Sequence, residues 1–134
     1  MVKILIVDDH PVVALGIKQI ISQSADFSIA AEAMTGSEAL KHLEEITIDV
    51  VLLDISLPDI NGLELLKIIK ERFQSVKVLI LSMHPEEQYA LRTIKAGASG
   101  YITKSSLPDE LLKAIRKVAE GKKYINPDFA EKTI

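Results

Sequence analysis

The sequence contains no cysteine, no long apolar run and no excess of basic residues. The absence of cysteine excludes disulfides and cysteine-based zinc sites, and it is consistent with a reducing cytoplasm. No apolar run approaches the roughly 20 residues of a membrane span, and the N-terminus shows no signal-peptide pattern. The formal net charge of −3 argues against nucleic-acid binding by this chain itself, because phosphate backbones attract clustered Lys and Arg. We therefore expect a soluble, cytoplasmic protein with no membrane partner.

Its 134 residues, of which 48% are hydrophobic and 26% charged, are enough for one globular domain. Short apolar runs alternate with segments of helical period. The runs at 4–7, 50–53 and 78–81 are continuously apolar, as is typical of strands buried on both faces of a parallel sheet. The predicted strands are residues 4–7, 27–33, 50–53, 78–81 and 100–102.

The segments between these runs favour helices. Thr35-x-x-Glu38 is a capping-box pattern that predicts the start of the second helix. Alternating strands and helices predict a doubly wound α/β fold with a five-stranded parallel sheet and five helices. The other helices are expected along Val13–Ile21, around Leu65–Ile69, from Pro85 to Gly97, and from about Ser106 to Gly121.

Polar side chains follow four of the predicted strands. Asp8 and Asp9 follow the first, Asp54 the third and Ser82 the fourth, and Lys104 lies just beyond the fifth. In open parallel sheets, ligands bind outside the carboxyl ends of the strands, where the strand order reverses. If the sheet is parallel, these five side chains gather at one edge.

Three crowded carboxylates repel one another, and a divalent cation removes that conflict. Mg²⁺ prefers oxygen ligands, keeps several waters and binds one or two carboxylates plus a substrate phosphate. Asp54, between such a metal and Lys104, is placed to attack phosphorus and form an aspartyl phosphate. Lys104 would neutralise the oxygens of the transferred group, and the Ser82 hydroxyl would donate a further hydrogen bond.

Each of these residues also has an ordinary interpretation. Asp8, Asp9 and Ser82 taken singly are more often caps of loops or helices, and Lys104 taken singly is more often a solvated lysine. Their joint occurrence at the ends of four strands favours the chemical interpretation. Tyr101 is either a half-buried edge aromatic or a moving one. The remaining candidates, His10 and His84, are interpreted as loop residues rather than metal ligands.

The sequence resembles the receiver domain of two-component response regulators, with the CheY-like (flavodoxin-like) fold, and more narrowly the NarL/FixJ group of transcription factors. The resemblance extends over residues 1–122, effectively the whole folded part. It rests on Ile-Leu-Ile-Val-Asp-Asp-His-Pro at 4–11, Asp-Val-Val-Leu-Leu-Asp-Ile-Ser-Leu-Pro-Asp-Ile-Asn-Gly at 49–62, Leu-Ser-Met-His at 81–84 and Ala-Gly-Ala-Ser-Gly-Tyr-Ile-Thr-Lys at 96–104.

The resemblance implies a role for each matching residue. Asp54 would be the phosphoacceptor and Lys104 the phosphate partner. Asp8, Asp9, Asp54 and the Ser56 backbone carbonyl would hold Mg²⁺, and Ser82 and Tyr101 would form the switch pair. The chain would then not be an enzyme beyond Mg²⁺-dependent self-phosphorylation and dephosphorylation at Asp54.

The resemblance also implies partners: a sensor histidine kinase as phosphodonor and a second copy on phosphorylation. Residues 123–134 resemble the start of a linker to a C-terminal helix-turn-helix domain, through which alone DNA would be bound. One departure is Ser105, because many receivers have proline in a cis bond after the lysine.

Two rival functions stay open. The first is a phosphatase of the haloacid dehalogenase type, which also uses an Asp after a parallel strand but needs a second Asp where Ser56 stands here. The second is a pseudo-receiver that keeps the fold without phosphorylation. The chain has no Gly-rich phosphate loop and no G-x-S-x-G element. Their absence excludes the phosphate-loop and serine-hydrolase sites that are built on those motifs.

Overall fold

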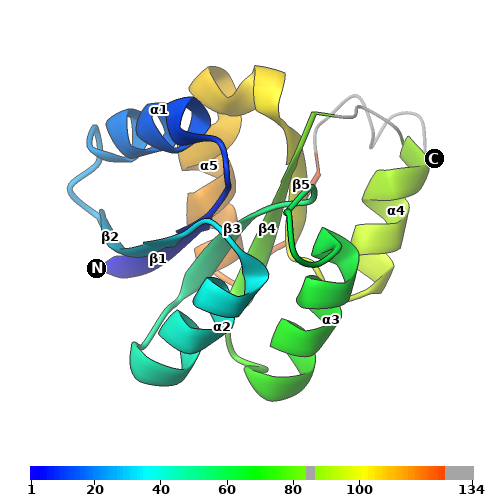
Figure 1. Cartoon of the computed structure of the whole chain (residues 1–134). Coiled ribbons are helices and arrows are strands. Elements are labelled where there is room, and N and C mark those ends of the chain that lie inside the picture. Colours follow the sequence, from blue (N-terminus) through cyan, green and yellow to red (C-terminus); the bar gives the residue numbers. More distant parts are fainter. Residues whose placement is uncertain (84–86, 126–134) are drawn as a thin grey trace.

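A computed structural model describes residues 1–83 and 87–125 (Figure 1), with strands and helices in alternation. The strands form one parallel sheet in the order β2-β1-β3-β4-β5-β6. Their bounds are β1 Val2–Val7, β2 Phe27–Ala33, β3 Val50–Asp54, β4 Lys77–Ser82, β5 Gly100–Thr103 and β6 Tyr124–Ile125. The helices are α1 Pro11–Ile21, α2 Gly36–Glu45, α3 Gly62–Arg72, α4 Glu87–Lys95 and α5 Leu107–Ala119, and a 3-10 turn spans Lys104–Ser106.

The doubly wound sheet and all five predicted strands are confirmed, and one further strand was not predicted. β6 pairs with the start of β5, Tyr124 opposite Gly100. Tyr124 is only 5% exposed, so this strand is packed although it lies in the stretch expected as linker. Two residues are too few to show a period of two, so the sequence pattern carries no signal for it.

The two faces of the sheet are covered by different helices. Ile4 and Ile6 of β1 pack with α1 and α5, whereas Leu5 and Val7 pack with α2, α3 and α4. Figure 1 shows these two layers on opposite sides of the strands. Because successive strand side chains point to opposite faces, a strand covered on both sides must be apolar throughout. This explains the continuous apolar runs of β1, β3 and β4.

The helix ends follow their local sequence signals with small departures. Thr35 Oγ1 accepts a hydrogen bond from the Glu38 backbone N–H at 3.1 Å, but the Glu38 carboxylate accepts from the Met34 N–H instead of completing the capping box. Beyond α4, Gly97 has a φ of 111°, a conformation that glycine adopts without strain. The start predicted for this helix, Pro85, lies outside the described residues.

The strand order reverses between β1 and β3. The chain leaves β1 for β2 on one side, and then crosses back so that β3, β4 and β5 extend the sheet on the other. The carboxyl ends of β1 and β3 therefore border the crevice where ligands of doubly wound sheets bind. Within residues 1–83 and 87–125, no helix is both long enough and apolar enough to cross a membrane.

Candidate functional site

Two carboxylates are buried side by side at the carboxyl ends of β1 and β3. Asp8 follows β1 and is 3% exposed, and Asp54 ends β3 and is 1% exposed. Asp9, the next residue after Asp8, is partly buried. The pairing of Val7 with Leu53 brings the two strand ends level, so Asp8 and Asp54 face the same crevice.

Lys104 brings a positive charge to this pair from the first residue after β5. Its Nζ lies 3.1 Å from Asp8 Oδ2 and 3.3 Å from Asp54 Oδ1, and its side chain is 6% exposed. A lysine so deeply buried is stable only when carboxylates compensate its charge. The Ser56 backbone N–H also donates to Asp54 Oδ1 at 3.2 Å.

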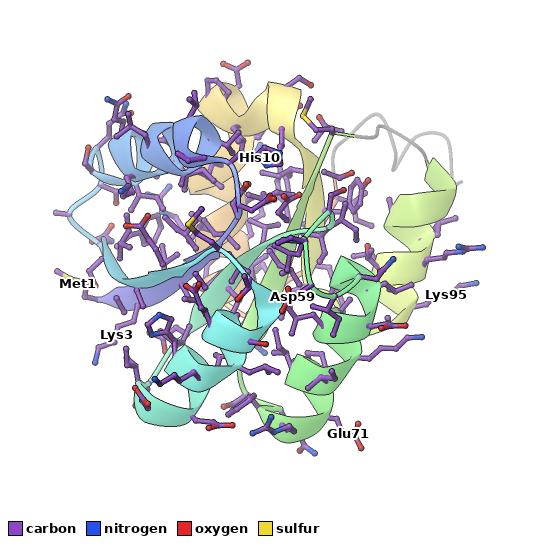
Figure 2. All side chains as sticks on the ribbon, viewed as in Figure 1. Met1, Lys3, His10, Asp59, Glu71 and Lys95 are labelled. Carbon is purple, nitrogen blue, oxygen red and sulfur yellow. The ribbon has the colours of Figure 1, made fainter. Side chains whose placement is uncertain are left out.

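His10 brings an imidazole to the other side of the same carboxylates. Its Nδ1 lies 2.9 Å from Asp8 Oδ1, 3.1 Å from Asp9 Oδ1 and 3.6 Å from Asp54 Oδ2. Figure 2 labels His10 at the carboxyl end of the sheet, where the chain passes from β1 into α1. Its side chain is 54% exposed, so the ring covers the solvent side of the cluster formed by Asp8, Asp9 and Asp54, which we call the acidic crevice.

Three buried carboxylate oxygens, Asp8 Oδ2, Asp9 Oδ1 and Asp54 Oδ2, have no hydrogen-bond donor of acceptable geometry. Asp8 Oδ2 and Asp9 Oδ1 do have a nitrogen within 3.1 Å, and these contacts are ion pairs rather than aligned hydrogen bonds. Buried charged oxygens without donors are costly, and a hard cation would satisfy them together. The ligand atoms of Asp8, Asp9, His10 and Asp54 all lie within 4.8 Å of one another, so this cluster could hold a metal ion.

Burial raises the pKa of the Asp54 carboxyl group above its ordinary value. The Ser56 N–H opposes this change in pKa, the negative charge of Asp8 reinforces it, and Lys104 opposes it. The net direction is upward, because a carboxylate without full solvation and beside another carboxylate binds its proton more tightly. A cation at the site would therefore favour the ionised form of Asp54.

The loop after β3 is held tightly against α2 and α3. The Gly62 N–H donates to Ile55 O at 3.0 Å, and a Cβ on Gly62 would come within 2.6 Å of Ile55 Cα, so only glycine fits. Asp59 accepts hydrogen bonds from the Gly36 and Ser37 N–H groups at 2.8 and 3.2 Å, which lower the pKa of its carboxyl group. This places Asp59 at the start of α2, as Figure 2 shows, and fixes the loop that follows Asp54.

The two remaining predicted residues lie in the neighbouring strands. Ser82 ends β4, is fully buried and pairs in register with Thr103, while its neighbour Leu81 pairs with Asp54. Tyr101 lies within β5 and is also fully buried, in the core shared with α3 and α4. Of the two interpretations of Tyr101, the half-buried edge aromatic is therefore wrong.

The structure thus brings Asp8, Asp9, Asp54 and Lys104 together, with Ser82 at the same edge of the sheet. The bond between Lys104 and Ser105 is trans, since no cis peptide occurs in the described part of the chain. Sequence reasoning missed the contacts of His10, which it interpreted as a loop residue. The only available signal was its position directly after two aspartates and before Pro11.

Comparisons with known proteins agree with this architecture. Residues 4–116 match the family described as the response regulator receiver domain. The chain is 37% identical to the transcriptional regulatory protein DegU of Brevibacillus brevis over 133 residues, which are 99% of this chain and 56% of DegU. It is also 37% identical to the response regulator UvrY of Escherichia coli, across 98% of this chain and 60% of UvrY.

A solved structure shows the same fold. The two-component response regulator of the LuxR family from an Aurantimonas species superposes with a TM-score of 0.91 and 38% identity, over 96% of this chain and 92% of that one. The chain belongs to the response regulator receiver family. It spans a little over half the length of the curated relatives it matches, and members of this family are generally regulators rather than classical enzymes.

Proposed function

We propose that this receiver domain accepts a phosphoryl group on Asp54 and changes conformation in response. The observation that carries the proposal is the position of Asp54: a carboxylate 1% exposed at the carboxyl end of a central strand, 3.3 Å from a buried lysine. An Asp oxygen attacks phosphorus, the bond from phosphorus to the donor breaks, and an aspartyl phosphate forms.

Mg²⁺ is the cofactor that best suits the oxygens present. Asp8, Asp9, Asp54 and the Ser56 backbone carbonyl would hold it, and three of these carboxylate oxygens lack a hydrogen-bond donor without it. When bound, the ion would offset the negative charge of the carboxylates and of the incoming phosphoryl oxygens.

Lys104 and Ser82 act on the transferred group. The Lys104 ammonium, already between Asp8 and Asp54, pairs with phosphoryl oxygens at charge-assisted strength. The Ser82 hydroxyl, at the end of the adjacent strand, donates a further hydrogen bond. Both groups stabilise charge that is spread over the oxygens as the transfer proceeds.

Ser82 and Tyr101 form the switch that transmits phosphorylation. A phosphoryl group adds about two negative charges and several strong acceptors, which draws Ser82 towards Asp54 and alters the packing beside Tyr101. Tyr101 is fully buried against the α4 side of the sheet, so its position responds directly to that packing. We expect a coupling of about 1–3 kcal/mol.

The family and the sequence support a wider role. Residues 1–122 are the receiver and 123–134 begin a linker to a helix-turn-helix domain, through which DNA is bound and transcription controlled. The protein acts in the cytoplasm, where a sensor histidine kinase supplies its phosphoryl group, and phosphorylation favours a homodimer. Turnover is limited to self-phosphorylation and dephosphorylation of Asp54.

Mass spectrometry after incubation with acetyl phosphate and Mg²⁺ tests the proposal. One phosphoryl group should be added to the parent and none to Asp54→Asn. Asp49→Asn serves as the control, because Asp49 is an exposed carboxylate near the opposite end of β3, and it should be labelled as fully as the parent. Undiminished labelling of Asp54→Asn would contradict the assignment.

A further inference from the structure

We propose that His10 is a fourth protein ligand for a divalent ion that prefers imidazole, such as Zn²⁺, so that the site accepts Zn²⁺ as well as Mg²⁺. The inference deepens the proposed function and rests on it, because the same three carboxylates take part in both. It adds a specificity-determining residue: His10 decides which ions the acidic crevice binds tightly.

The distances around His10 match those between ligands of one metal ion. With metal–ligand bonds of about 2.1 Å, neighbouring ligand atoms lie about 3.0 Å apart in an octahedral site and about 3.4 Å apart in a tetrahedral one. His10 Nδ1 lies 2.9, 3.1 and 3.6 Å from oxygens of Asp8, Asp9 and Asp54 respectively. Because the ligand atoms of all four residues lie within 4.8 Å of one another, small side-chain rotations would bring one atom of each residue to a single ion.

An acidic cluster alone would not establish such a site, but two of its oxygens are buried and lack donors. Asp9 Oδ1 and Asp54 Oδ2, which both face His10 Nδ1, have no hydrogen bond, and Asp54 is 1% exposed. A cation between Nδ1 and the carboxylates would satisfy both oxygens without moving the backbone.

Lys104 and His10 contact different oxygens of the same two carboxylates. Lys104 Nζ approaches Asp8 Oδ2 and Asp54 Oδ1, whereas His10 Nδ1 approaches Asp8 Oδ1 and Asp54 Oδ2. A metal on the His10 side therefore need not displace the lysine. Asp9, whose Oδ1 is 3.1 Å from Nδ1, completes the ligand set on that side.

The backbone holds His10 in place independently of its ring, so the ring can turn once the hydrogen bond between Nδ1 and Asp8 Oδ1 (2.9 Å) is broken. The His10 N–H donates to Asp8 Oδ1 at 2.8 Å, and Pro11 begins α1 immediately after it. The ring itself is 54% exposed, so turning it into solvent disturbs no core packing. Mg²⁺ prefers oxygen and water ligands, and we expect the ring to turn outwards when it binds. Zn²⁺ readily takes imidazole together with carboxylates in a four-coordinate site.

The two ions would then have opposite effects on phosphorylation. A Zn²⁺ ion held by four protein ligands has no open position, and Asp54 would be one of its ligands. Mg²⁺ retains waters that a phosphoryl oxygen can replace. We therefore expect excess Zn²⁺ to suppress labelling of Asp54 by acetyl phosphate.

Calorimetric titration of the metal-free protein with Zn²⁺ and, separately, with Mg²⁺ tests the inference. In His10→Ala and in the second variant His10→Asn, the Zn²⁺ affinity should fall at least about tenfold, while the Mg²⁺ affinity stays the same or rises. His42→Ala is the control, because His42 lies on α2, away from the acidic crevice, and it should bind both ions as the parent does. The His10 ring nitrogens should shift in NMR spectra with Zn²⁺ and keep nearly their metal-free shifts with Mg²⁺.

An unchanged Zn²⁺ affinity in both His10 variants would overturn the inference, and so would an equal fall in the affinity for both ions. Asp9→Asn separates this result from the proposed function, since it should lower the affinity for both ions. Suppose that Asp9→Asn lowers the Mg²⁺ affinity and that the parent is labelled on Asp54. If the His10 variants then bind Zn²⁺ as the parent does, only the role of His10 is wrong. Zn²⁺ that does not compete with Mg²⁺ for the parent protein would likewise contradict it.

Discussion

Polar groups at the amino end of the sheet have hydrogen-bond partners, whereas three buried carboxylate oxygens at the carboxyl end have none. Near the starts of the strands, the Lys3 N–H donates to Asp49 Oδ2 at 2.8 Å, and Lys70 Nζ donates to the Gln74 and Val76 carbonyls. The Tyr124 hydroxyl in β6 donates to Glu110 of α5. At the opposite end lie all three buried side-chain atoms that lack a hydrogen bond in the described part of the chain.

Within one fold, the amino end of the sheet therefore serves stability, whereas the carboxyl end holds the candidate functional site. The amino end follows the general rule that buried polar groups are paired. The carboxyl end breaks that rule with carboxylates close enough to repel, and such local violations concentrate at functional sites. The rest of the core supplies the stability that allows these repelling carboxylates to remain close together.

Removal of a single positive charge should give the largest difference in stability between the two ends of the sheet. Lys104→Met leaves Asp8 and Asp54 buried without their cation, and we expect the free energy of unfolding to fall by about 3 kcal/mol or more. Arg72→Met is the matched change at the amino end, where Arg72 pairs with Glu44 at the surface, and should cost less than about 1 kcal/mol. Urea unfolding of both variants without metal measures this, and equal losses would contradict the comparison.

A smaller difference is expected from neutralising one carboxylate at each end. Asp9→Asn should leave the metal-free melting temperature unchanged or higher, because it relieves repulsion, and should remove the stabilisation by Mg²⁺. That stabilisation is about 1.4 kcal/mol in the parent when Mg²⁺ is at ten times its dissociation constant. Asp49→Asn should instead lower the melting temperature slightly, because Asp49 accepts from Lys3, and keep the full response to Mg²⁺. Thermal melts in EDTA and in Mg²⁺ decide between these outcomes.

At the amino end, Tyr124→Phe should lower the free energy of unfolding by about 1 kcal/mol, since it removes one hydrogen bond and keeps the ring. Burial and the Glu110 carboxylate raise the pKa of Tyr124 well above its ordinary range. The hydroxyl therefore stays protonated, and this loss should be constant between pH 6 and 9. A loss that varies across this range, measured by chemical denaturation, would show that another group controls β6.

The subtlest difference is in the pH dependence of stability without metal. The pKa of Asp54 is raised in the folded protein, so its contribution opposes folding as pH rises from the ordinary carboxyl value through the folded one. The pKa of Asp59 is lowered, so its contribution is present above the ordinary value and is lost as pH falls through the folded one. Asp54→Asn should gain stability relative to the parent as pH rises, whereas the deficit of Asp59→Asn should shrink in acid. Unfolding curves from pH 3 to 8 in EDTA compare them, and profiles of the same sign would contradict the assignment.

The sequence by itself determined five of the six strands and placed Asp8, Asp9, Asp54, Ser82 and Lys104 at one edge of the sheet. Continuous apolar runs require cover on both faces, which makes the strands parallel, and parallel strands end at one edge. Those residues could be placed at that edge because each stands at or just beyond the end of a predicted strand.

Only the tertiary structure decided how the side chains at that edge are oriented. The sequence carries no signal that Lys104 and His10 contact opposite oxygens of Asp8 and Asp54, or that Tyr101 is wholly buried. The pairing of β6 and the cap that Asp59 gives to α2 are likewise long-range contacts. Periodicity describes which face a residue occupies within its own element, whereas rotamers and contacts between distant segments are settled only when the elements pack together.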